Sequence, residues 1–196
     1  MNILVDKFPT KVNLKGKIFK INSDFRVGIK IIQMYEDETL AQEEKTFIML
    51  KLLYKEKIPE ELIEEAINKA IIFLNADENI NNKNETSDIP VKRLYSFTKD
   101  AKYIYSAIKK THNVDLERIG YLHWWKFVYY FLDLDEKCFF SQMIYLRNQK
   151  NKGKLTKEEK SIYSNLEDIL ELDSSLGYSE EEQEAINKFM KYLGED

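Results

Sequence analysis

The segment from Leu122 to Tyr130, which reads Leu-His-Trp-Trp-Lys-Phe-Val-Tyr-Tyr, constrains the fold most because it holds both tryptophans of the chain. Neighbours on a helix lie about 100° apart, so apolar residues at 121, 122, 124, 125, 127, 128, 131 and 132 would cover most of the circumference. We therefore predict a central core helix. The apolar stretch is shorter than the ~20 residues that span a bilayer, so no membrane role is expected.

The alternative for this segment is that one aromatic side chain stays exposed and contacts a partner protein. Trp and Tyr dominate the residues that carry binding energy at protein interfaces. The candidates for such contact are Trp124, Tyr129 and Tyr130. The helical pattern does not decide which face is covered, so both interpretations can hold for different residues.

A short β-hairpin is predicted for residues 11–21, ahead of the helical part of the chain. Val12 and Leu14 alternate with polar residues, and Gly16 permits a tight turn. The alternative is an extended arm without a partner strand.

Three helices are predicted between residues 23 and 75. Ser23-Asp24 favours the first start, a capping box of Thr39 and Gln42 the second, and Pro59 the third. Residues at helical spacing mark the faces expected to be buried: Phe25, Ile29, Ile32 and Tyr35 in the first helix, Phe47, Leu50 and Tyr54 in the second, and Leu62, Ala66, Ala70 and Phe73 in the third.

Residues 75–90 are rich in Asn and cannot form a core, so a flexible loop between two helical layers is predicted there. Further helices follow. An apolar pattern predicts one helix from Leu94 to Ile108, Asp115 is expected to cap a second that runs to Leu132, and apolar residues at 139–146 predict a third. A capping box of Thr156 and Glu159 predicts a fourth, whose apolar side is Ile162, Leu166, Ile169 and Leu170. Another box, of Ser179 and Glu182, predicts the last helix. The fold class expected is a mainly α, multi-helix single domain over residues 1–196 with an N-terminal hairpin.

Charge and reactive residues argue against several function classes. The chain has 30 basic and 34 acidic residues, a net charge of −4, which disfavours a general nucleic-acid binder. His112 and His123 lack the spacing that places two metal ligands on one helix face. Cys138 is expected to be a small core residue, and a dyad with His123 is the alternative. We therefore expect neither an enzyme nor a bound cofactor.

One basic run, formed by Arg147, Lys150, Lys152, Lys154, Lys157 and Lys160, could contact nucleic acid or an acidic partner. No aromatic residue lies within 147–160 to stack bases, and two glutamates dilute the charge. A solvated connector is the favoured interpretation. The N-terminus carries no basic stretch followed by a long apolar run, so no signal peptide is expected and the protein is expected in the cytoplasm.

Three stretches carry a family resemblance, together with a downstream Tyr145-Leu146-Arg147. They are Asn22-Ser23-Asp24-Phe25-Arg26; Tyr95-Ser96-Phe97-Thr98-Lys99-Asp100-Ala101 with Tyr103-Ile104-Tyr105; and Asp115-Leu116 leading to Tyr121-Leu122-His123-Trp124-Trp125-Lys126-Phe127. The sequence resembles the "gp fifteen" family of tailed bacteriophages and prophages from about residue 8 to about residue 170. Phe25, Phe97, Ile104, Leu122, Trp125 and Phe127 are expected to be structural, together with His123.

The resemblance implies non-enzymatic work in building a phage tail within the host cytoplasm. By genomic placement, the family is similar to tail assembly chaperones, which coat the tape-measure protein until tube subunits replace them. The implied partners are the tape-measure and tail proteins, and self-association is left open. The alternative is a structural tail or adaptor component retained in the virion. Arg26 and Asp100 are polar motif residues within apolar helical pattern. At least one is expected to form a buried charged hydrogen bond, with the other as a candidate partner.

Overall fold

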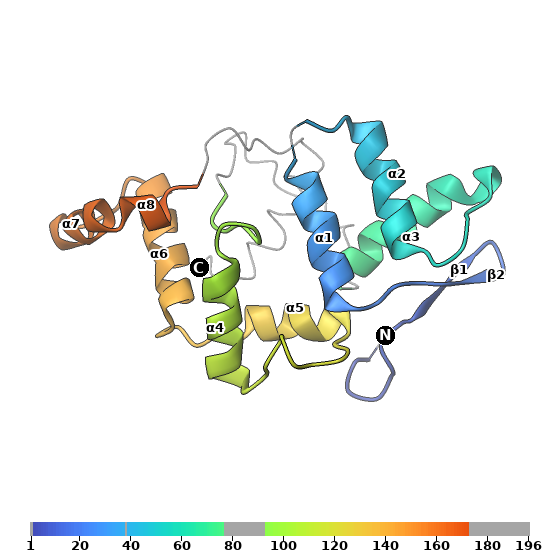
Figure 1. Ribbon diagram of the computed structural model, residues 1–196, viewed down its shortest axis with the longest axis horizontal. Helices are drawn as coiled ribbons and strands as arrows, with labels where there is room; N and C mark the ends of the chain where they lie inside the picture. Colours follow the sequence, from blue (N-terminus) through green and yellow to red (C-terminus); the bar gives the residue numbers. More distant parts are fainter. Residues whose placement is uncertain (1, 38, 77–92, 173–196) are drawn as a thin grey trace. The chain divides into compact units, whose positions relative to one another are not determined.

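The computed structural model describes residues 2–37, 39–76 and 93–172, which contain eight α-helices and one two-stranded antiparallel sheet (Figure 1). The prediction of a mainly α fold with an N-terminal hairpin is confirmed. The described residues divide into a first unit, 2–37, 39–76 and 120–129, and a second unit, 93–119 and 130–172. The assignment of residues 1–196 to a single domain stays a prediction.

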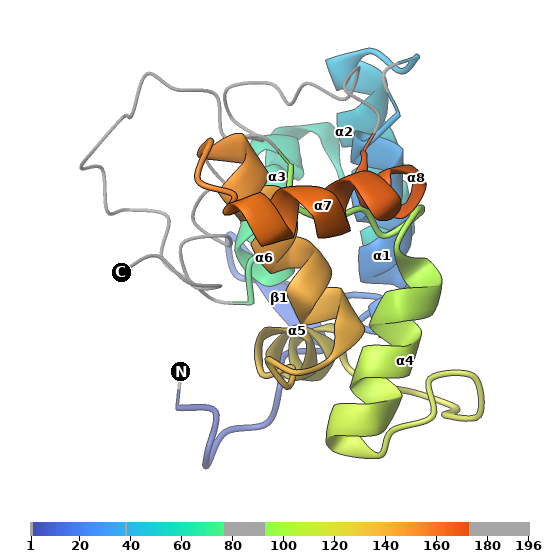
Figure 2. The same ribbon diagram turned by 90° about the vertical axis from the view of Figure 1, so that its left-hand side faces the viewer.

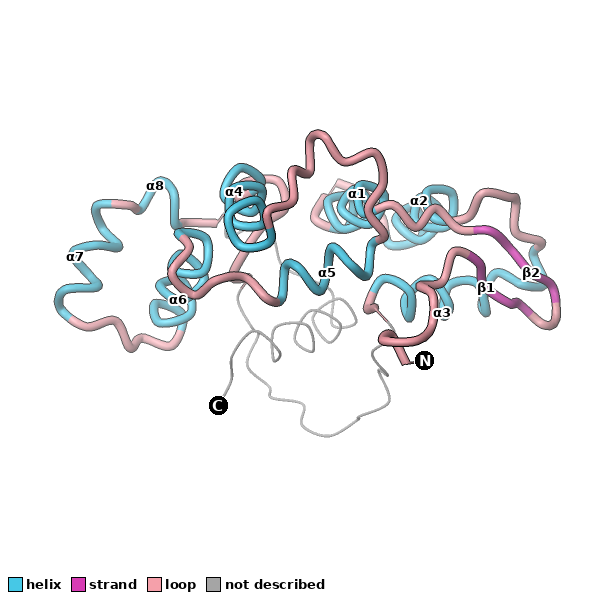
Figure 3. Tube along the Cα trace, turned by 90° about the horizontal axis from the view of Figure 1, so that it is seen from below, coloured by secondary structure: helices cyan, strands magenta, loops and turns pink. Residues whose placement is uncertain are grey.

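The first unit begins with the hairpin, whose strands are β1 (Lys11–Leu14) and β2 (Lys17–Lys20), drawn in magenta in Figure 3. Leu14 lies opposite Lys17, so the connecting loop has two residues. Lys15 and Gly16 both have positive φ, at 44° and 86°, as the preferred two-residue hairpin turn requires. The Gly16 N–H also donates to the Asn13 side chain at 2.8 Å. The hairpin predicted for residues 11–21 is therefore present.

Helices α1 (Phe25–Tyr35) and α2 (Gln42–Leu53) follow and lie side by side (Figure 1). Asp24 caps α1 by accepting from the Arg26 N–H, as predicted. The predicted Thr39 cap of α2 is wrong, because Thr39 donates instead to the Asp37 carboxylate at 2.6 Å. These bonds from Thr39 lower the pKa of Asp37. The helix begins after Ala41, whose N–H donates to Glu44 at 2.9 Å.

The buried face predicted for α2 is wrong in part: Tyr54 is buried as predicted, but the other two residues are not. Phe47 is 58% exposed and Leu50 is half-buried, while Met49 and Leu53 are buried. Lys45 is buried because its Nζ donates to the Tyr35 carbonyl at 2.8 Å. This bond places a cation at the negative C-terminal end of α1. Lys45, Met49 and Leu53 follow one another at four-residue spacing and share the buried face of α2, and Phe47 faces out.

The third helical segment is a short 3-10 turn, Glu60–Leu62, that continues as α3 (Ile63–Leu74). Its predicted face is confirmed, because Leu62, Ala66, Ala70 and Phe73 are all buried. The Tyr54 hydroxyl donates to the Ala66 carbonyl at 2.9 Å, and burial raises the pKa of this tyrosine. The loop predicted at 75–90 lies almost wholly outside the described residues.

The second unit contains α4 (Ala101–His112), α6 (Phe139–Asn151), α7 (Lys157–Asn165) and α8 (Glu167–Leu170) (Figure 2). Helix α5 (Trp124–Leu132) gives its last three residues to this unit and its first six to the other. Two groups of buried side chains form the core: an aromatic group of Tyr95, Phe97, Phe131 and Phe140, and a second group of Met143, Leu146, Tyr163 and Leu170.

Helix α5 begins later than predicted. Asp115 was expected to cap it, but its carboxylate accepts from the Tyr105 hydroxyl and the Lys109 ammonium, both at 3.0 Å. These bonds, with Lys109 contributing most, lower the pKa of Asp115 to about 2. Asp115 is also bonded to the Glu117 N–H, and the chain continues as a turn before Trp124.

The capping box of α7 is confirmed, because Thr156 accepts from the Glu159 N–H and the Glu159 carboxylate accepts from the Thr156 N–H. The predicted apolar face is partly wrong. Ile162 is 47% exposed, and its neighbour Tyr163 is buried instead. Leu170 is buried as predicted, while the box at Ser179 and Glu182 lies outside the described residues.

Candidate partner-binding surface

The two adjacent tryptophans close the C-terminal end of α3. The Trp124 indole N–H donates to the Leu74 carbonyl at 2.8 Å, and the Trp125 indole N–H donates to the Phe73 carbonyl at 2.7 Å. Both carbonyls belong to the last turn of α3, where carbonyls lack partners within the helix, and the Phe73 carbonyl also accepts from the Ala76 N–H at 3.1 Å. The two indoles therefore supply donors to this helix end, and the prediction of a core role is confirmed for Trp125.

Trp124 is also buried, with 3% of its surface exposed, so it is not the exposed aromatic contact that was predicted as an alternative. Its six-membered ring lies against Gly28 of α1. A Cβ added at Gly28 would approach the indole to 2.3 Å. The prediction failed because Gly28, which lies 96 residues earlier in the sequence, has no side chain and so leaves room for the ring.

His123 joins the N-terminal segment to the start of α5. Its Nδ1 accepts from the Trp125 N–H at 3.1 Å, so its Nε2 carries the proton and donates to the Pro9 carbonyl at 2.9 Å. The Phe8 ring stacks on the imidazole at 4.9 Å. Burial lowers the pKa of His123, although the bond to Pro9 acts in the opposite direction. We call His123, Trp124 and Trp125 the indole–imidazole centre.

Tyr129 and Tyr130, the other predicted contact residues, are half-buried. The Tyr129 ring lies 6.1 Å from that of Phe8 in the first unit. The Tyr130 ring stacks on His112 at 4.5 Å in the second unit, and its carbonyl lies 2.8 Å from His112 Nε2. Both side chains therefore make internal contacts, and their contact with a partner stays a prediction.

A buried ion pair lies at the centre of the second unit. Arg147 of α6 meets Asp100, just before α4, through two bonds of 2.7 and 3.0 Å. Asp100 is 0% exposed and Arg147 is 3% exposed. The expected buried charged hydrogen bond of Asp100 is thus confirmed, but its partner is Arg147. Arg26 was the expected candidate, and it pairs with Asp24 at 3.2 Å near the surface.

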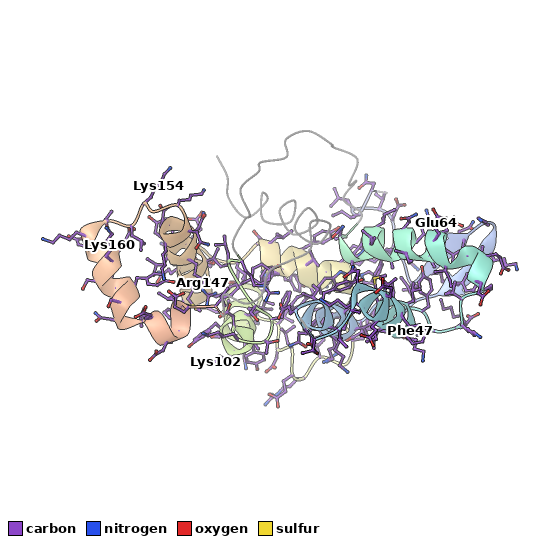
Figure 4. The ribbon with its side chains drawn as sticks, turned by 90° about the horizontal axis from the view of Figure 1, so that it is seen from above. Phe47, Glu64, Lys102, Arg147, Lys154 and Lys160 are labelled. Atoms are coloured by element: carbon purple, nitrogen blue, oxygen red, sulfur yellow. The ribbon has the colours of Figure 1, made fainter. Side chains whose placement is uncertain are left out.

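The remaining donors of Arg147 bind three backbone carbonyls. The Leu170 carbonyl accepts at 2.6 Å, that of Leu94 at 3.0 Å and that of Ile169 at 3.1 Å. The Ser96 N–H also donates to the Asp100 carboxylate at 3.0 Å. We call Asp100 and Arg147 the aspartate–arginine centre. The basic run predicted from the sequence included Arg147, but this side chain is buried and therefore does not belong to the exposed run (Figure 4).

Exposed apolar side chains on α6 and α7 form a surface that the sequence did not reveal. Tyr145 is 50% exposed, and its hydroxyl donates to Glu159 of α7 at 2.9 Å. This bond raises the pKa of Tyr145. Ile162, 47% exposed, lies three residues beyond Glu159 and so shares its helix face. We call Tyr145 and Ile162 the α6–α7 surface. Each of these residues lies next to buried apolar residues in the sequence, so the sequence alone does not show that it is exposed.

Cys138, the one cysteine of the sequence, contributes to the start of α6. Cys138 is buried, and its Sγ accepts from the Ser141 N–H at 3.4 Å at the start of α6, which confirms it as a core residue. Within residues 2–37, 39–76 and 93–172, no group of three His, Cys, Asp or Glu side chains could hold a metal ion. No helix in the same ranges has the length and apolar content to cross a membrane.

Comparison with known proteins supplies the family. The model of the family described as Bacteriophage Gp15 protein matches residues 4–172, which cover most of the chain and include both centres. No curated protein and no solved structure matches it. The match confirms the resemblance drawn from residues 22–26, 95–105 and 115–127. The chain therefore belongs to the Bacteriophage Gp15 protein family, which indicates a structural or morphogenesis protein of a bacteriophage.

Proposed function

We propose that this protein is a non-enzymatic tail assembly chaperone that binds the tape-measure protein in the host cytoplasm. The observation that carries the proposal is the α6–α7 surface, where Tyr145 and Ile162 stay exposed while neighbouring apolar residues are buried. Exposed apolar groups on helices suit contact with an apolar face of another helix. A long helical tape-measure protein would present such faces along its length.

The support of this surface makes it a stable platform. The Tyr145 ring is held by its bond to Glu159, and Glu159 is held in turn by the Thr156 capping box. Beneath it, Met143, Leu146 and Tyr163 form the buried group of the second unit. Side chains that are already ordered lose less entropy when a partner binds. The α6–α7 surface therefore fits repeated contact along an extended partner.

Co-expression with the tape-measure protein of the same phage tests the proposal. We expect the tape-measure protein to become soluble and to co-elute with several copies of this protein in size-exclusion chromatography with light scattering. If the tape-measure protein stays insoluble and this protein is found in purified virions, the chaperone role is wrong and a structural tail or adaptor component takes its place.

A further inference from the structure

A hollow of about 340 Å³ lies in the first unit, beside the hairpin. Its lining combines three lysines with three hydroxyl-bearing residues and one isoleucine: Lys11, Lys20, Lys55, Thr10, Ser23, Tyr121 and Ile21. No carboxylate is among these described lining residues. The described lining is therefore positively charged, although the net charge of the chain is −4.

Backbone pairing brings the three lysines together. The Ile21 N–H donates to the Thr10 carbonyl at 3.0 Å, and the Lys55 N–H donates to the Lys20 carbonyl at 3.1 Å. Ile21 and Tyr54 form an antiparallel bridge between the same segments. Three extended segments thus lie next to one another, and each supplies one lysine. The backbone pairing therefore sets the spacing of the three lysine residues.

Lys11 and Lys20 face each other directly across the two strands. Bonded pairs alternate along an antiparallel ladder, and the bond between Thr10 and Ile21 makes the Lys11–Lys20 pair a non-hydrogen-bonded one. Side chains approach most closely at such positions, and like charges directly opposite are destabilising. Within the described residues, no ion pair or hydrogen bond of the ammonium groups of Lys11, Lys20 and Lys55 relieves this repulsion.

Hydroxyl groups complete the lining. The Ser23 and Tyr121 hydroxyls lie 2.7 Å apart and hold each other, while Tyr121 remains 53% exposed. Lysine ammonium groups act as point charges toward oxyanions, and hydroxyls add donors. We propose that this hollow binds carboxylates from an acidic segment of a partner protein. The site lies wholly in the first unit and does not depend on the tape-measure assignment.

A protein carboxylate suits the lining better than a nucleic-acid phosphate. Sites for single strands combine a basic groove with aromatic rings on which successive bases stack. Tyr121 is the one aromatic side chain among the described residues of this lining, and its hydroxyl is bonded to Ser23.

Fluorescence anisotropy with a labelled polyglutamate peptide tests the site on the full chain. We expect wild-type protein to bind the peptide in a salt-sensitive manner. Replacing all three lysines (K11Q, K20Q and K55Q) should weaken binding by about tenfold, or about 1.4 kcal/mol. Lys17→Gln is the matched control for the single variant Lys20→Gln, which loses the same one charge, because Lys17 is exposed on the same strand but does not line the hollow.

A second measurement guards against misfolding. Lys20→Gln removes a repulsion, so its unfolding temperature should equal or exceed that of the wild type while peptide binding falls. The proposal is overturned if wild-type protein does not bind the peptide, or if the triple variant binds as tightly as Lys17→Gln. It is also overturned if a single-stranded oligonucleotide of equal charge binds more tightly than the peptide.

Discussion

In each unit a centre of buried side chains binds backbone carbonyls, but the two centres differ in charge. In the first, the indole–imidazole centre binds backbone carbonyls with neutral N–H groups, from Trp124 and Trp125 to α3 and from His123 to Pro9. In the second, the aspartate–arginine centre binds carbonyls with a guanidinium that also pairs with Asp100. A mutation in the neutral centre removes individual hydrogen bonds. A mutation that removes one member of the buried ion pair leaves the other charge buried without its partner. The two should therefore differ in how steeply mutation and pH affect them.

The largest effect is expected at the charged centre. Arg147→Met should lower the free energy of unfolding by about 3–5 kcal/mol, because it leaves the buried Asp100 carboxylate without its partner. Urea denaturation followed by circular dichroism measures this change. Lys102→Met on α4 is the control, because Lys102 is exposed (Figure 4).

The double variant Asp100→Asn with Arg147→Met sharpens the test. It removes the uncompensated charge while retaining a side chain that can accept from Ser96, so we expect it to be more stable than Arg147→Met alone. If Arg147→Met behaves like Lys102→Met, the ion pair does not organise the second unit.

A smaller loss is expected in the neutral centre from Gly28→Ala. The added methyl would meet the Trp124 ring at 2.3 Å, and such overpacking costs about 1–3 kcal/mol. That cost must exceed the roughly 0.5–1 kcal/mol that alanine normally gains over glycine in a helix. Thermal unfolding checks the result, with Gly120→Ala as the control because nothing lies within 4 Å of its added Cβ. Equal unfolding temperatures for both variants would contradict the close packing of Gly28 on Trp124.

The smallest effect is a pH dependence carried by His123. Because burial lowers its folded-state pKa below 6.5, the unfolded chain takes up the proton first as the pH falls. Stability should thus be highest above pH 6.5 and decrease as the pH falls toward the lowered value. His123→Gln should flatten this dependence, while His112 remains present in both proteins. Denaturation midpoints measured across this pH range give the comparison, and parallel curves would rule out His123 as the titrating group.

Local sequence signals predicted the elements whose residues act on near neighbours. The face of α3 and the Thr156–Glu159 box were correct, because helical spacing and capping both operate within one or two turns. Thr39 and Asp115 failed as caps because other polar side chains compete for them: Asp37 in the first case, and Tyr105 with Lys109 in the second. Local pattern cannot rank such competitors.

Tertiary partners were beyond the reach of local pattern. A charged bond for Asp100 was foreseen, but Arg147 lies 47 residues further along the chain and Arg26 was the expected candidate. Trp124 looked free to face solvent because nothing in its own helix shows that Gly28 makes room for it. The exposed Ile162 has the same apolar character as a buried residue, so the α6–α7 surface became visible in the fold alone.

The most direct test of the account separates binding from folding on the α6–α7 surface. Ile162→Asp places a charge on the exposed apolar position, and Ser161→Asp places the same charge on the adjacent exposed residue. Each variant is co-expressed with the tape-measure protein, and soluble tape-measure protein is measured. We predict that Ile162→Asp keeps its unfolding temperature and loses the soluble complex, whereas Ser161→Asp keeps both. Equal amounts of complex for the two variants would contradict partner binding at this surface.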